Sequence, residues 1–555
     1  MDRAGRRVAR VQAAAVVMCA ALGLAGCSTS ADDAATKGTP GLEKYYSQAL
    51  DWKDCSKQPG FSSGRQGVDG LDKLECTWLT VPMDYANPSG ETIKLALARS
   101  TAENSQGSIV INPGGPGGSG VDVVAAFVDG LGDRSRDVLD VVGFDPRGVG
   151  RSAPVDCLSD DDLNVFLTTD IDTTSEEGIA QAEAAVAEFA EGCLELTGSL
   201  LEHVDTISAA RDMDVIRAAL GESTLNYLGV SYGTQLGATY AALFPDRVGR
   251  MVLDAAVDPT ALDETTVIQA GGFESALRAY VTDCLASDGC PLSGSVDEAM
   301  DQVVAVVEQA TDQPLSIGDL KVLETLFREL VDLDAETAAL VAVEVVGGLG
   351  DRQLTGALAL TGIFTALYSQ DAWEQLTMAL RFAIDNQDGT MLMLLADTYL
   401  QRCDGLTCPV EDGYYSNMME AHTAIGCADN RKTRDADAMA AEAEQIRQVA
   451  PHLAEYFISE VDECADWPTP VTESLRSYAA KGAPPIVVIG TTNDPATPYQ
   501  WAQALAEMLD SGVLVTYEGE GHGAYLRGVK CIQTAVDDFL VDGKVPEDGL
   551  TCSAS

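Results

Sequence analysis

The sequence predicts an α/β fold in which a mostly parallel central sheet has helices on both faces and a large helical cap insertion. Short apolar strands alternate with helices and turns from residue 75 to residue 259, and the same alternation returns in residues 470–555. Residues 260–469, between these two parts, read as mostly helical. Strand–helix–strand order is typical of parallel βαβ units. We therefore expect residues 41–259 and 470–555 to form one core domain and residues 260–469 to form its cap.

The individual elements follow from apolar runs bounded by Gly, Pro and Asp. The predicted strands of the core span residues 92–99, 108–112, 138–144, 225–230, 250–253, 485–490 and 513–517. The predicted helices of the core span residues 121–128, 206–220, 233–244, 499–509 and 529–540. Within the cap, residues 334–346 and 375–384 are Ala- and Leu-rich and are expected to be helical.

The first 27 residues read as an export signal and not as part of the fold. Four arginines precede an apolar run, residues 11–25, which is too short for a stable membrane span. The run ends in Leu24-Ala-Gly-Cys27, which looks like a bacterial lipobox. We expect Cys27 to be lipidated and to anchor the protein outside the cytoplasm, with residues 28–40 as a flexible tether. The alternative is ordinary signal cleavage beside an incidental cysteine, and release of some protein from the cell also stays open.

The charge of the chain is strongly negative, with 35 basic and 86 acidic residues and a net charge of −51. A nucleic-acid-binding protein would need a basic patch, and none is visible. The simplest interpretation is solubility. A second interpretation is that local acidic groups attract cationic substrates, such as peptides with free amino ends.

Fourteen cysteines occur, and twelve remain once Cys19 and Cys27 are set aside with the signal. In an exported protein this even number predicts up to six disulfides. The sequence does not fix how they pair, and the local pairs that we expect are Cys284–Cys290, Cys403–Cys408 and Cys531–Cys552. No Cys-x-x-Cys zinc spacing is present, and we expect neither a metal nor a cofactor.

The central chemical motif is Gly229-Val-Ser-Tyr-Gly233, because a predicted strand precedes it and a predicted helix follows it. A sharp strand–turn–helix exposes the serine hydroxyl, and small residues on both sides let the backbones approach closely. The segment Gly60-Phe-Ser-Ser-Gly64 matches the same pattern, but it lacks both the strand and the helix. We therefore predict that Ser231 is a nucleophile.

A serine hydroxyl needs a base, and the chain has four histidines. His203 precedes a helix, and His422 and His452 lie in the cap, where nothing in the local sequence suggests catalysis. His522 lies in Gly521-His-Gly523, between the predicted strand 513–517 and the last helix. We predict that His522 is the base.

The third member of the triad must be a carboxylate that orients the imidazole. Asp494 follows the strand 485–490 and gives the chain order Ser, Asp, His. Asp254, at the end of the strand after the nucleophile helix, is the rival. We favour Asp494 and expect Asp254 to cap or order the loop that leads into the cap.

Acyl transfer also needs donors for the oxyanion. One should be the backbone N–H of Tyr232, which follows the nucleophile. The other should come from Gly114 or Gly115, at the end of the strand 108–112, where glycine lets the main chain approach a substrate.

With these residues assigned, the chain resembles the actinobacterial tripeptidyl aminopeptidases, which are α/β-hydrolases related to the proline iminopeptidases. The matching segments are Asn112-Pro-Gly-Gly-Pro-Gly-Gly-Ser-Gly120, Asp145-Pro-Arg-Gly-Val-Gly-Arg-Ser152, Tyr227-Leu-Gly-Val-Ser-Tyr-Gly-Thr234, Asp494-Pro-Ala-Thr-Pro498 and Gly521-His-Gly523. A further segment, Ala424-Ile-Gly-Cys-Ala-Asp429, looks like a cap motif of this family. The resemblance implies a cap that admits the free N-terminus of a peptide, with Asp429 as a candidate substrate-binding residue or, equally, a loop aspartate beside a disulfide.

The resemblance implies a secreted serine exopeptidase that releases short peptides, tripeptides above all, through an acyl-enzyme. One alternative is a carboxylesterase or lipase, since the same triad cleaves esters and amides. A second alternative is a lipoprotein that captures peptides without turnover, although a complete Ser, Asp and His set argues against it. Side-chain preference and oligomeric state are not predicted by the sequence.

Overall fold

The fold was described from a computed structural model, which places residues 41–61, 73–173, 175–261, 265–319, 322–323, 349, 352–403, 414–429, 436–459, 461–470 and 475–553. The signal with Cys27, the tether, residues 62–64 of the second Gly-x-Ser-x-Gly match and the predicted helix 334–346 lie outside the described residues. Their assignments stay predictions. In the described part, no helix has the length and apolarity needed to cross a membrane.

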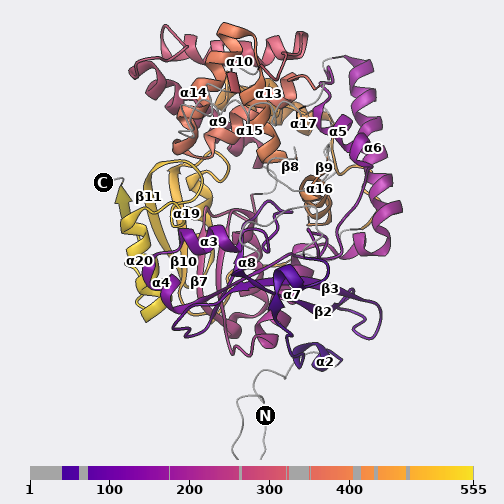
Figure 1. Ribbon diagram of the computed structural model, residues 1–555, viewed down its shortest axis with the longest axis vertical. Coiled ribbons are helices and arrows are strands. Elements are labelled where there is room, and N and C mark those ends of the chain that lie inside the picture. Colours follow the sequence, from indigo (N-terminus) through magenta and orange to yellow (C-terminus); the bar gives the residue numbers. More distant parts are fainter. Residues whose placement is uncertain are drawn as a thin grey trace, which may run out of the picture. The chain divides into compact units, whose positions relative to one another are not determined.

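The described core strands form one ten-stranded sheet (Figure 1). Its spatial order is β1 (Lys53–Asp54), β2 (Glu75–Pro82), β3 (Thr92–Ser100), β5 (Asp140–Phe144), β4 (Ser108–Asn112), β6 (Leu225–Val230), β7 (Val248–Asp254), β10 (Ile486–Asn493), β11 (Gly512–Glu520) and β12 (Leu550–Ser553). All neighbours from β5 to β12 pair in parallel, while β1, β2, β3 and β5 pair antiparallel. The predicted fold class is thus confirmed, and the carboxyl ends of β4, β6, β7, β10 and β11 meet at one edge.

Helices cover both faces of this sheet because the strands are apolar on both sides. Ile109 and Ile111 of β4 belong to one buried cluster, whereas Val110 between them belongs to the other. The first cluster packs under α3 (Val124–Gly130), α4 (Asp133–Val138) and α20 (Lys530–Asp542). The second packs under α7 (Thr206–Ala219), α8 (Tyr232–Leu243) and α19 (Tyr499–Met508).

The chain between β7 and β10 is a helical insertion that gathers on one side of the sheet (Figure 1). Its described helices are α9 (Thr265–Ala286), α10 (Val296–Asp312), α13 (Gly356–Leu367), α14 (Trp373–Arg381), α15 (Thr390–Leu400), α16 (Met418–Asp429), α17 (Ala436–Val449) and α18 (Ala454–Phe457). A short ribbon of β8 (Arg402–Cys403) and β9 (Tyr414–Tyr415) precedes α16. These elements form the cap.

Two helices from the first half of the chain, α5 (Asp160–Thr168) and α6 (Glu176–Thr197), also lie beside the cap (Figure 1). After α5, the carboxylate of Asp170 accepts the first amides of α13, from Gly356 at 2.8 Å and Ala357 at 2.7 Å. A carboxylate at a helix N-terminus satisfies free amides and favours the helix dipole. This contribution of residues 160–197 to the cap region was not predicted from the sequence.

Five disulfides join described cysteines: Cys55–Cys76, Cys157–Cys193, Cys284–Cys290, Cys427–Cys464 and Cys531–Cys552. Two of the three predicted local pairs, Cys284–Cys290 and Cys531–Cys552, are confirmed. The third cannot be compared because Cys408 lies outside the described residues. The Cys427–Cys464 bond was not predicted, and it ties α16 to the segment that returns from the cap to β10.

A buried ion pair fixes the loop after β5 onto α7. The guanidinium of Arg147 donates to both carboxylate oxygens of Asp212 at 2.8 Å, and both side chains are fully buried. Arg147 also donates to the carbonyls of Met83 and His203 at 2.9 Å, and Tyr85 donates its hydroxyl to Asp212. A buried ion pair whose hydrogen bonds are all made holds its two segments in one position. Removing one partner leaves the other as an unpaired buried charge.

The substitution Arg147→Met should therefore lower the free energy of unfolding by about 3–5 kcal/mol, because Asp212 would stay buried without its counter-charge. Denaturant-induced unfolding followed by fluorescence would measure the loss. The double variant Arg147→Met/Asp212→Leu is the matched control and should recover most of it, since an apolar pair of similar volume is often neutral. A double variant as unstable as the single one would contradict this account.

Candidate active site

Ser231 occupies the sharp turn between β6 and α8, as the sequence predicted. Its φ of 58° and ψ of −129° lie in a region that costs a non-glycine residue about 1–3 kcal/mol. The flanking glycines are required by close approach: a Cβ at Gly229 would lie 2.3 Å from the Gly233 carbonyl oxygen, and one at Gly233 would lie 2.7 Å from that of Asn112. The turn thus holds the Ser231 side chain above the carboxyl edge of the sheet, at the start of a helix.

Asp494 and His522 come together at the same edge. His522 Nδ1 lies 2.9 Å and 3.0 Å from the two carboxylate oxygens of Asp494. The carboxylate is buried and is itself held by the amides of Ala496 and Thr497 and by the Thr497 hydroxyl, at 2.9–3.0 Å. Burial lowers the pKa of His522, but the attraction of Asp494, its hydrogen bond and the nearby Asp254 outweigh it, so the pKa is raised above 6.5.

Asp254 orders a different loop from the one the sequence suggested. Its carboxylate accepts the amides of Ala524 at 3.1 Å and Tyr525 at 2.8 Å, just after His522. Among the described residues it accepts no amide of the loop into the cap. Its carbonyl accepts the Ser231 amide at 3.1 Å. One residue at the end of β7 therefore connects the nucleophile turn to the loop that carries the base.

The structure excludes one of the predicted oxyanion donors, the amide of Gly114. A Cβ at Gly114 would lie 2.8 Å from Ser231 Cβ and 3.1 Å from the Tyr232 nitrogen, so the glycine loop does lie against the nucleophile turn. The Gly114 amide, however, donates to the side-chain oxygen of Asn112 at 3.0 Å. Among the described residues, neither Tyr232 nor Gly115 has an acceptor for its amide hydrogen. These two amides are the candidates for an oxyanion hole.

The Ser231 hydroxyl makes no hydrogen bond to the His522 ring among the described residues. The two residues nevertheless share one edge of the sheet through Asp254, and the Val230 side chain lies 4.0 Å from a Cβ placed on Gly523. Catalytic hydrogen bonds are often long without substrate and tighten when it binds.

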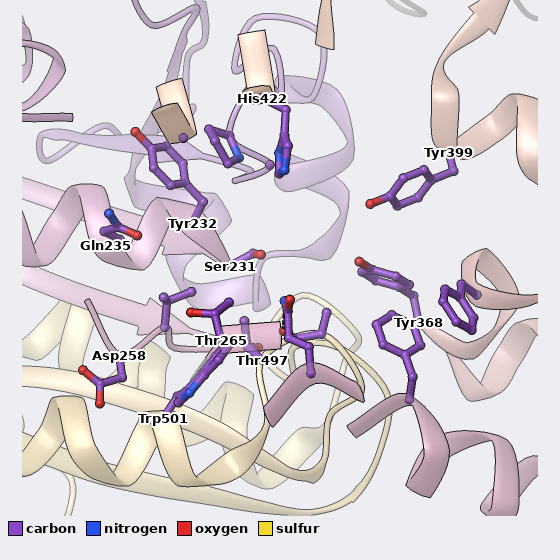
Figure 2. Close-up of a pocket in the computed structure, with 18 of the residues that line it drawn as sticks. Ser231, Tyr232, Gln235, Asp258, Thr265, Tyr368, Tyr399, His422, Thr497 and Trp501 are labelled. Carbon is purple, nitrogen blue, oxygen red and sulfur yellow. Dashed lines mark hydrogen bonds between the residues drawn. The ribbon is translucent and has the colours of Figure 1, made fainter. Parts of the chain in front are cut away.

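A cavity of about 520 Å³ opens above Ser231, between the core and the cap. In Figure 2, Ser231 lies between Tyr232 and Gln235 on one side and Tyr368 and Tyr399 on the other. The core contributes the catalytic serine and the glycine loop, and the cap contributes the opposite wall. The cavity is large enough for a short peptide or an ester of similar size.

Comparisons with known proteins agree with this geometry. Residues 107–298 match a family model described as alpha/beta hydrolase fold, and residues 450–552 match one described as TAP-like protein. Serine protease Hip1 of Mycobacterium tuberculosis is 35% identical over 545 residues, 97% of this chain and 96% of that protein. Carboxylesterase B of the same species is 35% identical over 540 residues, 96% and 94% of the two chains. The tripeptidyl aminopeptidase of Streptomyces lividans is 31% identical over 517 residues, 91% and 86% of the two chains.

The chain belongs to the tripeptidyl aminopeptidase family of α/β-hydrolases. It is a serine hydrolase, since its relatives include serine peptidases and its core is an α/β-hydrolase domain.

The cap of this serine hydrolase supplies an aromatic wall that the sequence did not predict. Phe273 stacks on Phe364 with ring centres 4.3 Å apart, and Phe457 lies 5.5 Å from Phe364. Tyr368 continues the wall and reaches the base: its ring lies edge-on to His522 at 5.2 Å, and its carbonyl accepts the His522 amide at 2.8 Å. The helical pattern of the cap does not indicate that these aromatic residues face the cavity. Thr497, which also lines the cavity, lies in the segment Asp494–Pro498 that the sequence had already indicated.

The opposite side of the cavity is polar and is formed by α16. His422, which the sequence analysis set aside, lines the cavity near Pro116, and enclosure by protein lowers its pKa. Asp429 also lines the cavity and accepts the amide of Thr206 at 2.7 Å and its hydroxyl. Burial raises the pKa of Asp429 to about 7, against the lowering effect of the Thr206 hydrogen bonds. Asp429 is the last residue of α16 and lines the cavity, so it is not a loop aspartate, although Cys427 beside it forms a disulfide.

Substitutions of Asp494 and Asp254 should have different effects, because Asp494 orients the His522 ring whereas Asp254 holds the loop that carries it. Asp494→Asn should lower kcat roughly 10⁴-fold while leaving the fold intact, because the amide favours the wrong imidazole tautomer. Asp254→Asn should reduce kcat far less and should mainly lower the unfolding midpoint, since His522 keeps its partner. Ester turnover and thermal unfolding would measure both effects.

Ser231→Ala serves as the control for these variants, and it should abolish labelling by a fluorophosphonate probe. Equal kcat values for Asp494→Asn and the wild type would rule out the assigned triad.

Proposed function

We propose that this serine hydrolase is an exopeptidase that releases short peptides, three residues long, from free N-termini through an acyl-enzyme. Ser231 attacks the scissile carbonyl and forms the Oγ–C bond while His522 takes its proton. The amides of Tyr232 and Gly115 stabilise the oxyanion. As the C–N bond breaks, His522 returns the proton to the leaving amine, and water then hydrolyses the acyl-enzyme. Asp494 orients His522 throughout.

The observation that carries this proposal is the half-buried carboxylate of Asp429 in the same cavity as Ser231. A carboxylate in an enclosed site, already held by Thr206, is suited to bind an ammonium group through a charge-assisted hydrogen bond. A simple ester substrate has no group that would need it. The names of the peptidase relatives point the same way.

A carboxylesterase is the second candidate, because a relative named Carboxylesterase B is as similar to this chain as Hip1 is. The aromatic wall formed by Phe273, Phe364 and Phe457 would suit an apolar acyl group as well as a peptide side chain. The triad accepts both kinds of bond, so the two functions differ in what Asp429 contributes.

The pH dependence of kcat/KM should show whether Asp429 binds an ammonium group. Because the pKa of Asp429 is raised to about 7, its anion forms only as the pH rises through 7. A peptide α-amino group loses its proton near pH 8. Hydrolysis of a free tripeptide anilide should therefore peak between these values. Hydrolysis of a nitrophenyl ester, which needs only neutral His522, should rise to a plateau.

Asp429→Asn is the matched variant for that profile. It should lower kcat/KM for the free tripeptide by about 10- to 100-fold, the equivalent of one charged hydrogen bond, and leave the ester within about threefold. N-acetylation of the tripeptide should have the same effect on the wild type. If acetylated and free tripeptides are cleaved equally fast, the exopeptidase proposal is wrong.

We also propose that the enzyme works outside the cytoplasm, held to the membrane by lipid at Cys27. The support is the apolar run followed by Leu24-Ala-Gly-Cys27 and the number of disulfides in the described chain. Cys27→Ser should move the protein from the detergent phase to the aqueous phase in a detergent phase-separation assay. Unchanged partitioning would exclude lipidation at this residue.

A further inference from the structure

One face of α16 is turned to the cavity above Ser231. His422, Gly426 and Asp429 are spaced by four and three residues, which places them on one side of a helix, and all three line the cavity. Within α16, His422 and Gly426 are the most exposed residues, and both line the cavity. We call these three residues the α16 face.

Gly426 has more free space beside its Cα than most α-helical glycines in the described part of the chain. A Cβ on Gly237 would lie 2.6 Å from the Leu253 side chain, and one on Gly362 would lie 2.3 Å from a Leu392 carbonyl oxygen, so packing requires those glycines. A Cβ on Gly426 would meet no described atom within 4 Å. Glycine inside a helix is unfavourable compared with alanine. Packing against described atoms does not require glycine here, and because Gly426 lines the cavity, its missing side chain leaves the cavity open at this point.

The length of the α16 face matches a short peptide. His422 lies against the glycine loop, where its amide is 3.3 Å from a Cβ placed on Gly117 and its ring interacts with the Pro116 carbonyl. Asp429 lies seven residues further, which is about 10 Å along a helix axis. Three extended peptide residues span at most about 10 Å. The interval from the oxyanion loop to Asp429 thus corresponds to three residues of substrate.

We propose that the α16 face sets the length of the released peptide at three residues, with Gly426 as the specificity-determining position. This inference rests on the proposed exopeptidase function. The scissile carbonyl lies beside His422 and the glycine loop, and the terminal ammonium lies at Asp429. The middle of the tripeptide passes Gly426, whose missing side chain leaves it room. A side chain at this position projects into the path of the substrate without displacing the fold.

A graded series at residue 426 tests this in the full-length enzyme. Gly426→Ala should raise the unfolding midpoint and keep most of the activity. Gly426→Leu and Gly426→Phe should lower kcat/KM for Ala-Ala-Ala-p-nitroanilide at least about 100-fold, because a bulky group excludes the substrate. Hydrolysis of p-nitrophenyl acetate, whose acyl group does not reach Gly426, should stay within threefold of the wild type.

Gly271→Ala is the matched control, since Gly271 is a helical glycine on α9 that does not line the cavity and whose Cβ would make ordinary contact with Val449. It should change neither activity. If Gly426→Leu cleaves the tripeptide within threefold of the wild type, the inference is wrong although the proposed function stands. If the wild type cleaves the ester but no peptide of any length, the proposed function itself is wrong.

Moving the carboxylate from residue 429 to residue 426 gives a second test, in which the length of the released peptide is measured. Damage to the site would lower activity but would not change this length. In Gly426→Asp/Asp429→Asn, the acid moves three residues along α16, about 4.5 Å, which is close to the span of one peptide residue. The main product from a peptide library should shift from tripeptides to dipeptides. Continued release of tripeptides alone would overturn the proposal.

Discussion

The site depends on one constraint, the parallel pairing of β4, β6, β7, β10 and β11 side by side. Parallel strands end at a common edge, so loops from residues more than 400 positions apart in the chain meet there. Asp254 fixes two of these loops relative to each other, because its carbonyl accepts the Ser231 amide and its carboxylate accepts the amides of Ala524 and Tyr525. Movement of β7 would therefore disturb the nucleophile turn and the base loop together.

The cap adds a second level of organisation to this edge. Tyr368 contacts the backbone and ring of His522, so the wall of the cavity and the orientation of the base are mechanically linked. The Cys427–Cys464 disulfide and the Thr206–Asp429 hydrogen bonds hold α16 from two directions. The enclosure that results explains the perturbed pKa values: the carboxyl of Asp429 is harder to ionise and the ring of His422 is harder to protonate away from bulk water.

The catalytic groups lie in the core, whereas much of the cavity wall comes from the cap. The core holds the groups that any acyl transfer needs, and relatives with peptidase and esterase names match the core and the cap together at the same 35% identity. We expect substrate choice to depend on the walls of the cavity, where Tyr368 and Tyr399 lie on one side of Ser231 and His422 of α16 lies on another (Figure 2).

The sequence by itself determined the fold class and the positions of Ser231, Asp494 and His522, because each depends on local pattern. It placed the ends of β10 and β11 at residues 490 and 517, whereas these strands end at Asn493 and Glu520. A strand–turn–helix with glycines at fixed offsets is a short-range signal, and only four histidines had to be considered. The tertiary structure alone decided which cap residues face the cavity and that α5 and α6 lie beside the cap. It also decided that Asp254 supports the base loop, that the Gly114 amide is already bonded, and that Cys427 pairs with Cys464. All of these features depend on contacts between segments far apart in the chain. Helical periodicity predicts which face of a helix is buried, but it does not predict which segment packs against that face.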